Sequence, residues 1–240
     1  MVLSKLSRTL RKLLPLQDCG AVIVAAGTAS RMGGIDKVMA PLKGEPMLVH
    51  TVRAFQNSEV IREIVIVTRQ DLVEPVTELC SGFSKVKTVA VGGSSRTESV
   101  QNGLNALSKG MKLAAIHDGA RPLISARVIE RTVRAANSYG AAAPAIAVKD
   151  TIKQVQGGVV TQTPDRSLLR AVQTPQVFDV DILRGGLKKV RDSKLEVTDD
   201  CSAVERMGMS VKIVEGDERN MKITTPMDLK VAQLLMEEEA

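Results

Sequence analysis

Short apolar runs recur along the chain, separated by longer segments in which apolar residues have a helical spacing. Each run carries apolar side chains at successive positions, which is typical of strands in a parallel sheet covered on both faces. Runs of this kind predict strands at residues 22–26, 63–68, 86–91, 112–116, 140–144 and 209–214. The chain is therefore expected to build its sheet from several short, buried strands.

Helices are predicted between these strands. Pro46 stands where the first helical residue is expected, and Leu48, Val52 and Phe55 follow it on one face. Ser125 is a candidate N-cap for a second helix. Further helices are predicted at residues 201–207 and 228–236. Because strands and helices alternate, we expect an α/β fold with a mostly parallel sheet and helices on both faces.

Residues 150–163 break this alternation. They form two β-prone runs joined by Gly157-Gly158, and a two-glycine junction favours a tight hairpin turn that needs positive φ angles. A hairpin inserted into a parallel α/β domain does not pair easily with its sheet. We therefore expect a protruding arm at about residues 145–165. Two interpretations stay open: a hairpin folded back on its own domain, or an arm that clasps a second subunit.

Residues 1–17 differ in composition from the rest of the chain. They carry cations, leucines at helical spacing and a stop at Pro15, so they are interpreted as a basic N-terminal extension before a single domain at residues 18–240. A membrane-surface or targeting helix has a similar pattern. We expect a short solvated or packed extension instead, without membrane contact.

Composition narrows the function further. The net charge is +6, but Lys5, Arg8, Arg11 and Lys12 supply +4 of it, so the body of the protein is nearly balanced. Aromatic residues are scarce, with one Tyr, three Phe and no Trp. Such a chain lacks the stacking platforms and the basic groove of a nucleic-acid-binding protein. Three widely separated cysteines and no membrane-length apolar stretch predict a cytoplasmic protein.

A small-residue loop follows the first predicted strand. The loop at residues 27–30 (Gly-Thr-Ala-Ser) has little side-chain volume, so successive backbone N–H groups can approach a polyphosphate. Arg31 and Lys37 add cations. No Gly-Lys-Ser/Thr closes the loop, so this is not a Walker motif. A tight strand-to-helix connection is the alternative interpretation.

Charged and small residues also follow the later strands. Ligands of parallel sheets bind beyond the carboxyl ends of the strands, so these positions are expected to hold a ligand with several phosphates. Each cluster also has a structural interpretation, with Thr198 as an N-cap, Arg121 in a surface ion pair and Gly92-Gly93 as a turn. His117 is expected to orient the loop at Asp118. The cations placed at strand ends are Arg31, Lys37, Arg121, Arg166 and Lys222.

An ordered set of motifs resembles the 2-C-methyl-D-erythritol 4-phosphate cytidylyltransferases of the non-mevalonate isoprenoid pathway. The resemblance runs from about Cys19 to Leu235 and departs from the family pattern at Ala29, where glycine is usual, and at Asp36-Lys37-Val38, where Pro-Lys-Gln is usual. The motifs are Ala25-Ala26-Gly27-x-x-x-Arg31-Met32, His117-Asp118-Gly119-Ala120-Arg121-Pro122, Asp150-Thr151-Ile152-Lys153, Asp165-Arg166-Ser167, Gln173-Thr174-Pro175-Gln176, Thr198-Asp199 and Asn220-x-Lys222-Ile223-Thr224-x-Pro226.

The resemblance implies a Rossmann-like nucleotidyltransferase domain, a β-arm, a homodimer and a divalent cation such as Mg²⁺. It implies catalytic roles for Arg31, Lys37 and Lys222, and Mg²⁺ held mainly by the CTP phosphates. The expected CTP-binding residues are Ala25, Ala26, Gly27, Thr28, Ala29, Ser30, Arg31, Gly93, Ser94, Ser99 and Asp118. The expected substrate-binding residues are Asp118, Arg121, Thr151, Arg166, Thr174, Thr198 and Lys222, with Thr151 supplied by the partner subunit.

The reaction so implied is attack by the phosphate oxygen of a polyol phosphate on the α-phosphorus of CTP, with release of pyrophosphate. The nucleophile is already ionised at neutral pH, so positioning and electrostatic stabilisation dominate and no general base is needed. Other interpretations remain: a ribitol 5-phosphate cytidylyltransferase, a sugar-1-phosphate or molybdenum-cofactor nucleotidyltransferase, and a catalytically silent nucleotide-binding protein on the same fold.

Overall fold

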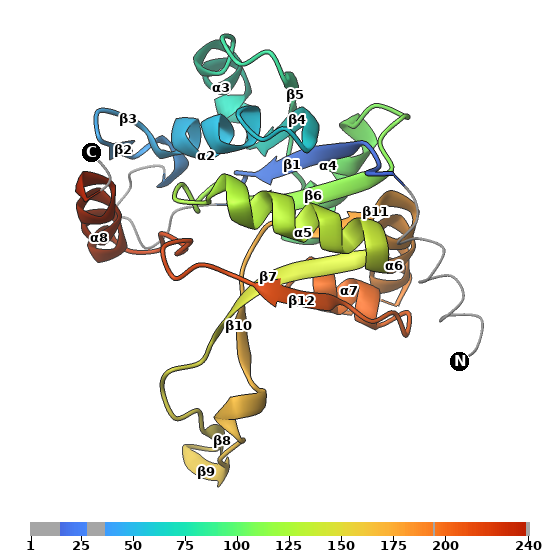
Figure 1. The fold of residues 1–240 in the computed structure, drawn as a ribbon, viewed down its shortest axis with the longest axis vertical. Coiled ribbons are helices and arrows are strands. Elements are labelled where there is room, and N and C mark those ends of the chain that lie inside the picture. Colours follow the sequence, from blue (N-terminus) through green and yellow to red (C-terminus); the bar gives the residue numbers. More distant parts are fainter. Residues whose placement is uncertain (1–14, 28–36, 194, 239–240) are drawn as a thin grey trace.

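The protein is built around a central β-sheet (Figure 1). The computed structural model describes residues 15–27, 37–193 and 195–238, and within them eight strands form this sheet. The strand order is β10-β7-β11-β6-β1-β4-β5, and β12 pairs with β7. Neighbours are parallel except that β11 runs antiparallel to β6 and β7, and β10 antiparallel to β7. The strands are β1 (Cys19–Val24), β4 (Ile61–Thr68), β5 (Val86–Val91), β6 (Leu113–Asp118), β7 (Ala141–Ala147), β10 (Arg170–Val172), β11 (Gln176–Asp179) and β12 (Lys212–Glu215).

Helices cover both faces of the sheet and create two cores. Ala21 and Ile23 of β1 face one core, whereas Val22 faces the other, as the alternation of a strand requires. The first core is closed by α2 (Met47–Gln56), α3 (Val73–Leu79) and α5 (Ala126–Tyr139). The second is closed by α4 (Arg96–Ala106), α6 (Val180–Asp192) and α7 (Asp200–Glu205). The predicted α/β class with a doubly covered, mostly parallel sheet is confirmed.

The predicted elements exist, but several boundaries and caps differ. The strand predicted at 22–26 is β1, which begins at Cys19 because small buried residues there already pair with β4 and β6. Pro46 is the N-cap of α2 and not its first residue, and the Ser125 side chain makes no capping hydrogen bond. Thr198 is not the cap of α7: that residue is Asp199, whose carboxylate accepts from the backbone N–H of Ser202.

The strands β10 and β11 were not predicted. They return from the arm to the sheet and pair with β7 at Ala145–Ala147 and at Ala141–Ala142. Their sequences are short and are separated by the polar stretch at residues 173–175, so neither shows the apolar run by which the other strands were recognised. β11 lies between β6 and β7, which makes it a central strand in spite of its length.

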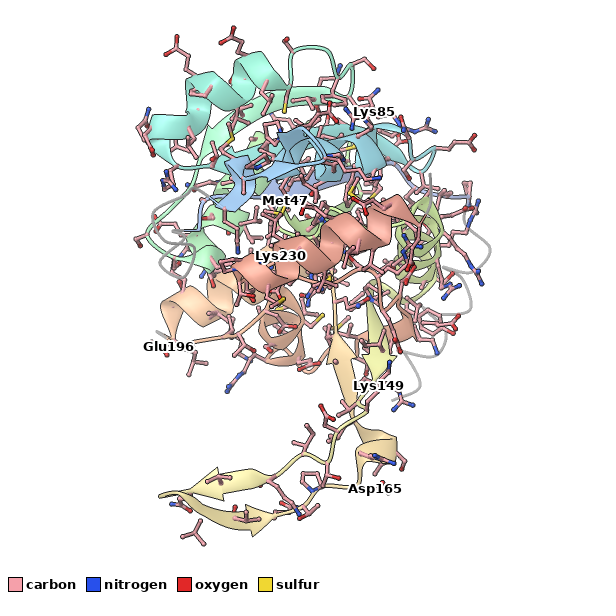
Figure 2. The ribbon with its side chains drawn as sticks, turned by 90° about the vertical axis from the view of Figure 1, so that its left-hand side faces the viewer. Met47, Lys85, Lys149, Asp165, Glu196 and Lys230 are labelled. Carbon is pink, nitrogen blue, oxygen red and sulfur yellow. The ribbon has the colours of Figure 1, made fainter. Side chains whose placement is uncertain are left out.

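A hairpin arm projects from the sheet, as Figures 1 and 2 show. It consists of β8 (Gln154–Gln156) and β9 (Val159–Gln162), joined by Gly157 at φ 57° and Gly158 at φ 82°. The predicted primed turn is thus confirmed, since both central residues need the left-handed region that glycine tolerates. The hairpin extends away from the domain, so the interpretation in which it folds back on its own domain is wrong.

The C-terminal segment closes a third, smaller core beside the sheet. The helix α8 (Pro226–Glu237) packs its Ala232 with Leu42 and Met47, around the short hairpin of β2 (Pro41–Leu42) and β3 (Glu45–Pro46). Thr225 and Asp228 form a capping box at its start. Three one-turn helices complete the described fold: η1 (Lys37–Met39), η2 (Gln70–Leu72) and η3 (Arg166–Leu168).

The predicted N-terminal extension lies mostly outside the described residues, which begin at Pro15. Its last residues contact α5, where the N–H of Gln17 donates to Asn137 Oδ1 at 3.0 Å. Among the described helices, none combines the length and apolar character that crossing a bilayer requires.

Candidate functional site

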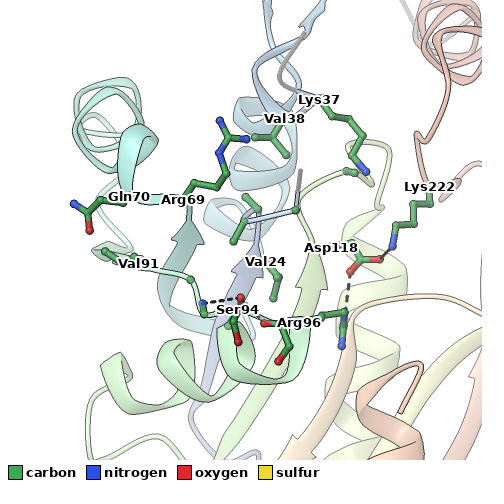
Figure 3. A pocket seen from close by; sticks show the side chains of 18 residues that line it. Val24, Lys37, Val38, Arg69, Gln70, Val91, Ser94, Arg96, Asp118 and Lys222 are labelled. Carbon is green, nitrogen blue, oxygen red and sulfur yellow. Dashed lines mark hydrogen bonds and ion pairs between the residues drawn. The ribbon is translucent and has the colours of Figure 1, made fainter. Parts of the chain in front are cut away.

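A cavity of about 560 Å³ opens beyond the carboxyl ends of β1, β4, β5 and β6, and Figure 3 shows its lining side chains. Its position is the one expected for a ligand site in a parallel sheet. Residues following each of these strands line it, together with Lys37 of η1 and Lys222 before α8. The cavity therefore lies at the edge of the sheet where the sequence predicts a ligand site.

The loop after β1 contributes Ala25, Ala26 and Gly27 to the cavity wall. The backbone N–H of Ala25 donates to Val67 O at 2.7 Å, which fixes the start of this loop to β4. The predicted loop residues Thr28, Ala29, Ser30 and Arg31 lie outside the described part of the chain. The described part of the chain begins again at Lys37, which lines the cavity.

The loop between β5 and α4 is packed tightly against the loop after β1. A Cβ on Gly92 would lie 2.5 Å from Ala26 Cβ, so only glycine allows this approach. Ser99 Oγ accepts from the Gly93 N–H at 3.0 Å and donates to Ser95 O at 2.9 Å. These bonds hold the loop of residues 92–95 in one shape at the rim of the cavity.

Asp118 ends β6 and is the centre of a charged cluster at the cavity. Its carboxylate lies 2.9 Å from Lys222 Nζ, and 3.7 Å from nitrogens of both Arg96 and Arg121. Burial on its own would raise the pKa of Asp118, but the neighbouring cations outweigh it and lower this pKa to about 2. Asp118 is therefore ionised at neutral pH, and the cluster still carries excess positive charge toward the cavity.

Arg121 is directed at the segment that carries Lys222. Its Nη1 donates to the carbonyl oxygen of Asn220 at 2.6 Å, and Asn220 Nδ2 donates to the Thr174 carbonyl at 2.8 Å. The Ile223 N–H donates to Ala120 O at 2.9 Å. These contacts fix the backbone on both sides of Lys222, while 42% of the Lys222 side chain stays exposed to the cavity.

His117 contacts the loop that follows Asp118 from the buried side, as its position next to Asp118 in the sequence predicts. The ring is fully buried: Nε2 lies 3.2 Å from Arg121 O and Nδ1 lies 3.0 Å from Thr174 Oγ1. Donation from Nε2–H to the carbonyl requires Nδ1 to accept from the Thr174 hydroxyl. That hydroxyl in turn accepts from the Asp118 N–H at 3.2 Å. Thr174 thus connects His117 to the backbone of Asp118.

The buried ring of His117 gives the folded state a defined pH dependence. Burial lowers the pKa of His117 to about 4. As the pH falls, His117 takes up a proton in the unfolded chain before it does so in the folded protein. The free energy of unfolding is therefore expected to fall as pH drops from about 6.5 to 4, by about 3 kcal/mol in total. Urea unfolding at several pH values, compared between the wild type and His117→Asn, measures this contribution. The same pH dependence in both proteins would contradict it.

Other predicted site residues lie apart from the cavity within one chain. Thr151 and Arg166 are exposed on the arm, and Arg166 Nη1 donates to Lys149 O at 2.8 Å. The prediction that Arg166 stands at a strand end of the main sheet is wrong, because the chain around it belongs to the arm and to η3. Thr198 is exposed next to α7, whereas Thr174 is buried beneath Asp118.

Three charged residues at or beside the cavity are not among the predicted site residues. Arg96 and Arg69 line the cavity, and Asp200 lies 2.8 Å from Arg96 Nη2. Arg96 follows the glycine–serine loop after β5, and Arg69 directly follows β4, so the strand-end rule that selected the other cations covers both. Asp200 carried no such signal, because an acid in the first turn of a helix is ordinary.

The described residues contain no group of three or more His, Cys, Asp and Glu side chains placed to hold a metal ion. Within that part of the chain, Asp118 is the one carboxylate among the residues that line the cavity. Such a donor set suits Mg²⁺, which commonly takes one or two carboxylates and completes its shell with phosphate oxygens and water.

A family model described as 2-C-methyl-D-erythritol 4-phosphate cytidylyltransferase matches residues 19–238. Two relatives with that name come from Symbiobacterium thermophilum and Geobacillus kaustophilus. The first is 44% identical over 91% of this chain and 93% of its own length. The second is 43% identical over 90% of this chain and 96% of its own length.

Solved structures agree with these sequence matches. The 4-diphosphocytidyl-2C-methyl-D-erythritol synthase of Anaerococcus prevotii superposes with a TM-score of 0.85 at 29% identity, covering 93% of this chain and 100% of that one. The 2-C-methyl-D-erythritol 4-phosphate cytidylyltransferase of Thermus thermophilus gives 0.77 at 31% identity, covering 92% and 100%. The nucleotidyltransferase fold that the motifs imply is confirmed.

Proposed function

Because this chain belongs to the 2-C-methyl-D-erythritol 4-phosphate cytidylyltransferase family, we infer that it transfers the cytidylyl group of CTP to 2-C-methyl-D-erythritol 4-phosphate. The products are pyrophosphate and 4-diphosphocytidyl-2-C-methyl-D-erythritol. The observation that carries this inference is the cavity at the strand ends, which Ala25, Ala26 and Gly27 line together with the cluster of cations around Asp118.

We propose that CTP lies across this cavity with its base beside the loop after β5. Gly93, Ser94 and Ser99 border that end of the cavity, and Ala25, Ala26 and Gly27 begin the loop proposed to bind the triphosphate. The remaining residues assigned to that loop are Thr28, Ala29, Ser30 and Arg31. The polyol phosphate is proposed to bind at the other end, near Asp118, Arg121 and Lys222, where the positive charge is concentrated.

The proposed chemistry needs charge stabilisation more than proton transfer. The attacking phosphate oxygen is an anion, and the α-phosphorus of CTP is surrounded by further anionic oxygens. Lys222 is proposed to bind the transferring phosphate, and Lys37 with Arg31 to stabilise the charge that develops on it and on the departing pyrophosphate. The position of Lys222, whose Nζ lies 2.9 Å from Asp118 Oδ2 at the cavity, supports its part of this assignment.

A divalent cation is proposed to accompany CTP. Mg²⁺ bound mainly by the triphosphate would neutralise charge on the leaving group, which is the contribution it makes to most nucleotidyl and phosphoryl transfers. Among the described residues that line the cavity, Asp118 is the one carboxylate.

We propose that the enzyme is a homodimer held by the arm. Val155, Val159 and Val160 on the hairpin are 53–69% exposed, and Leu168 at its base is 81% exposed. Apolar side chains on a projecting two-stranded hairpin call for a covering surface, because such a hairpin alone is only marginally stable. A partner clasp would also bring Thr151 and Arg166 of one subunit toward the cavity of the other.

Three further proposals concern the environment of the enzyme. We place it in the cytoplasm, because its three cysteines are buried and free, as expected in a reducing compartment. We expect no nucleic-acid partner, given the single Tyr, three Phe and absent Trp. Residues 1–17 are proposed to be an extension without membrane contact.

Pyrophosphate release tests the function directly. We expect turnover with CTP, Mg²⁺ and 2-C-methyl-D-erythritol 4-phosphate, and none when ribitol 5-phosphate replaces the acceptor. Turnover with ribitol 5-phosphate alone would keep the mechanism and change the substrate. Absence of pyrophosphate with both acceptors, in protein shown by calorimetry to bind CTP, would instead favour a silent nucleotide-binding protein. A panel of nucleoside triphosphates distinguishes the sugar-1-phosphate and molybdenum-cofactor enzymes.

A further inference from the structure

A buried carboxylate lies directly behind the charged cluster of the cavity. Asp200 is 1% exposed, and its Oδ2 lies 2.8 Å from Arg96 Nη2. The same guanidinium nitrogen lies 3.7 Å from Asp118 Oδ1, and Lys222 Nζ lies 2.9 Å from Asp118 Oδ2. Acidic and basic side chains therefore alternate from the interior to the cavity in the order Asp200, Arg96, Asp118 and Lys222, and Figure 3 shows the last three.

The backbone around Asp200 is held rigidly. The N–H groups of Asp200 and Cys201 both donate to Gln176 Oε1 at 3.0 Å, and Gln176 Nε2 donates to Asp199 Oδ2 at 2.8 Å. The start of α7 is thus bound to the central strand β11. The packing of α7 on α6 is also close, since a Cβ on Gly186 would lie 2.9 Å from the carbonyl oxygen of Ala203. Asp200 is consequently held at a fixed position beside Arg96.

Stability alone is a poor explanation for this pair. Burying a carboxylate is unfavourable, and burial raises the pKa of Asp200, an effect that Arg96 opposes. Buried ion pairs can often be replaced by apolar residues without loss of stability. Arg96, in contrast, reaches the cavity, where 31% of its side chain is exposed. The pair therefore connects the interior to the reacting end of the site.

We propose that Asp200 is a positioning residue, which fixes Arg96 beside Asp118 so that Lys222 can leave Asp118 for the transferring phosphate. The proposal rests on the function inferred above. Lys222 is paired with Asp118 in the structure and must give up part of that contact to bind phosphate. Arg96 then compensates the Asp118 carboxylate, which otherwise both retains Lys222 and repels the incoming anions.

Steady-state kinetics of Asp200→Asn, Arg96→Met and the double variant test this arrangement. Asn keeps the shape of Asp and removes its charge. Each single change is expected to lower kcat about tenfold, with the KM for CTP changed less than threefold. Because both act through the same contact, the double variant should be no slower than the slower single variant. Additive losses, or kinetics of Asp200→Asn equal to the wild type, would overturn the proposal.

A second comparison separates positioning from general damage to the fold. In a Lys222→Met background, Asp200→Asn is expected to lower kcat less than twofold, because there is no lysine left to release. An undiminished tenfold loss in that background would show that Asp200 acts by another route. Thermal unfolding of each variant checks the fold. If Asp200→Asn does not fold, Arg96→Lys, which keeps the charge but shortens the side chain, takes its place: it should lower kcat about tenfold alone and less than twofold in the Lys222→Met background.

Two controls complete the design. Arg131→Met removes an ion pair with Glu215, 2.7 Å long and between α5 and β12, and should leave the kinetics unchanged. Turnover by the wild type distinguishes a failure of the proposed function from a failure of the positioning proposal. If the wild type releases no pyrophosphate, the proposed function has failed. If it does and the Asp200 variants behave like it, only the positioning proposal has failed.

Discussion

Replacing Lys222 by methionine is expected to lower kcat about 10²–10³-fold, the typical effect of removing one preorganised donor from a transition state. Methionine keeps most of the length of the side chain and removes its charge. Lys222 lies 2.9 Å from Asp118 at the end of the cavity, with the backbone on both sides fixed by Arg121 and Ala120. Its ammonium group can therefore meet a developing negative charge with little reorganisation.

The measurement is the steady-state rate of pyrophosphate release at saturating CTP and acceptor. Lys188→Met is the matched control, because Lys188 is also an exposed lysine paired with an acid, Asp192, but lies on α6 away from the cavity. Its kcat should equal that of the wild type. A Lys222→Met enzyme with normal kcat and a raised KM would mean that Lys222 contributes equally to ground state and transition state, and would remove it from the catalytic residues.

The geometry of the cluster explains why a carboxylate belongs among so many cations. Asp118 holds Lys222 in place before the substrate arrives, and the same carboxylate is kept ionised by Lys222 at 2.9 Å together with Arg96 and Arg121 at 3.7 Å. Without it, three like charges would repel one another at the end of β6. With it, the cluster keeps a positive excess that an anionic substrate can use. An electrostatic site for two anions thus requires an internal anion to order its cations.

The parallel strands could be predicted because a strand buried on both faces has apolar side chains at successive positions of its sequence. The strand at residues 86–91 was predicted with its observed bounds, and β4, β6 and β7 within a few residues. The hairpin turn at Gly157-Gly158 could also be predicted, because positive φ angles restrict the choice of residue there. The cavity followed from topology, since polar loops after several parallel strands must meet at one edge of the sheet.

The antiparallel insertion and the interior charges were not predictable in this way. The strand β11 has Gln176 and Asp179 at its ends and only Val177 and Phe178 between them, too few apolar residues for a periodic pattern. The contact between Asp200 and Arg96 joins the beginnings of α7 and α4, which are far apart in sequence. Such a pair depends on how two helices that are distant in sequence pack into the same core, so no local pattern predicts it.

Deleting residues 151–163 is expected to convert the enzyme into an inactive monomer. This segment contains both strands of the hairpin and the exposed Val155, Val159 and Val160. If the hairpin clasps a second subunit, its removal takes away apolar contact area and also Thr151. Sedimentation velocity should show the dimer dissociating at micromolar concentrations, and the rate of pyrophosphate release should fall with it. A fully active monomer would refute the clasp.

Mixing two inactive variants tests whether the arm acts on the partner's cavity. One variant lacks residues 151–163 and keeps Lys222; the other keeps the arm and carries Lys222→Met. In a mixed dimer, the intact arm of the second subunit can reach the intact cavity of the first, so activity should appear that neither protein has alone. If each arm instead serves its own cavity, every subunit stays defective and mixing restores nothing. Complementation therefore assigns the deleted segment, which includes Thr151, to a site shared between subunits, whereas its absence from mixtures with proven mixed dimers confines that segment to one chain.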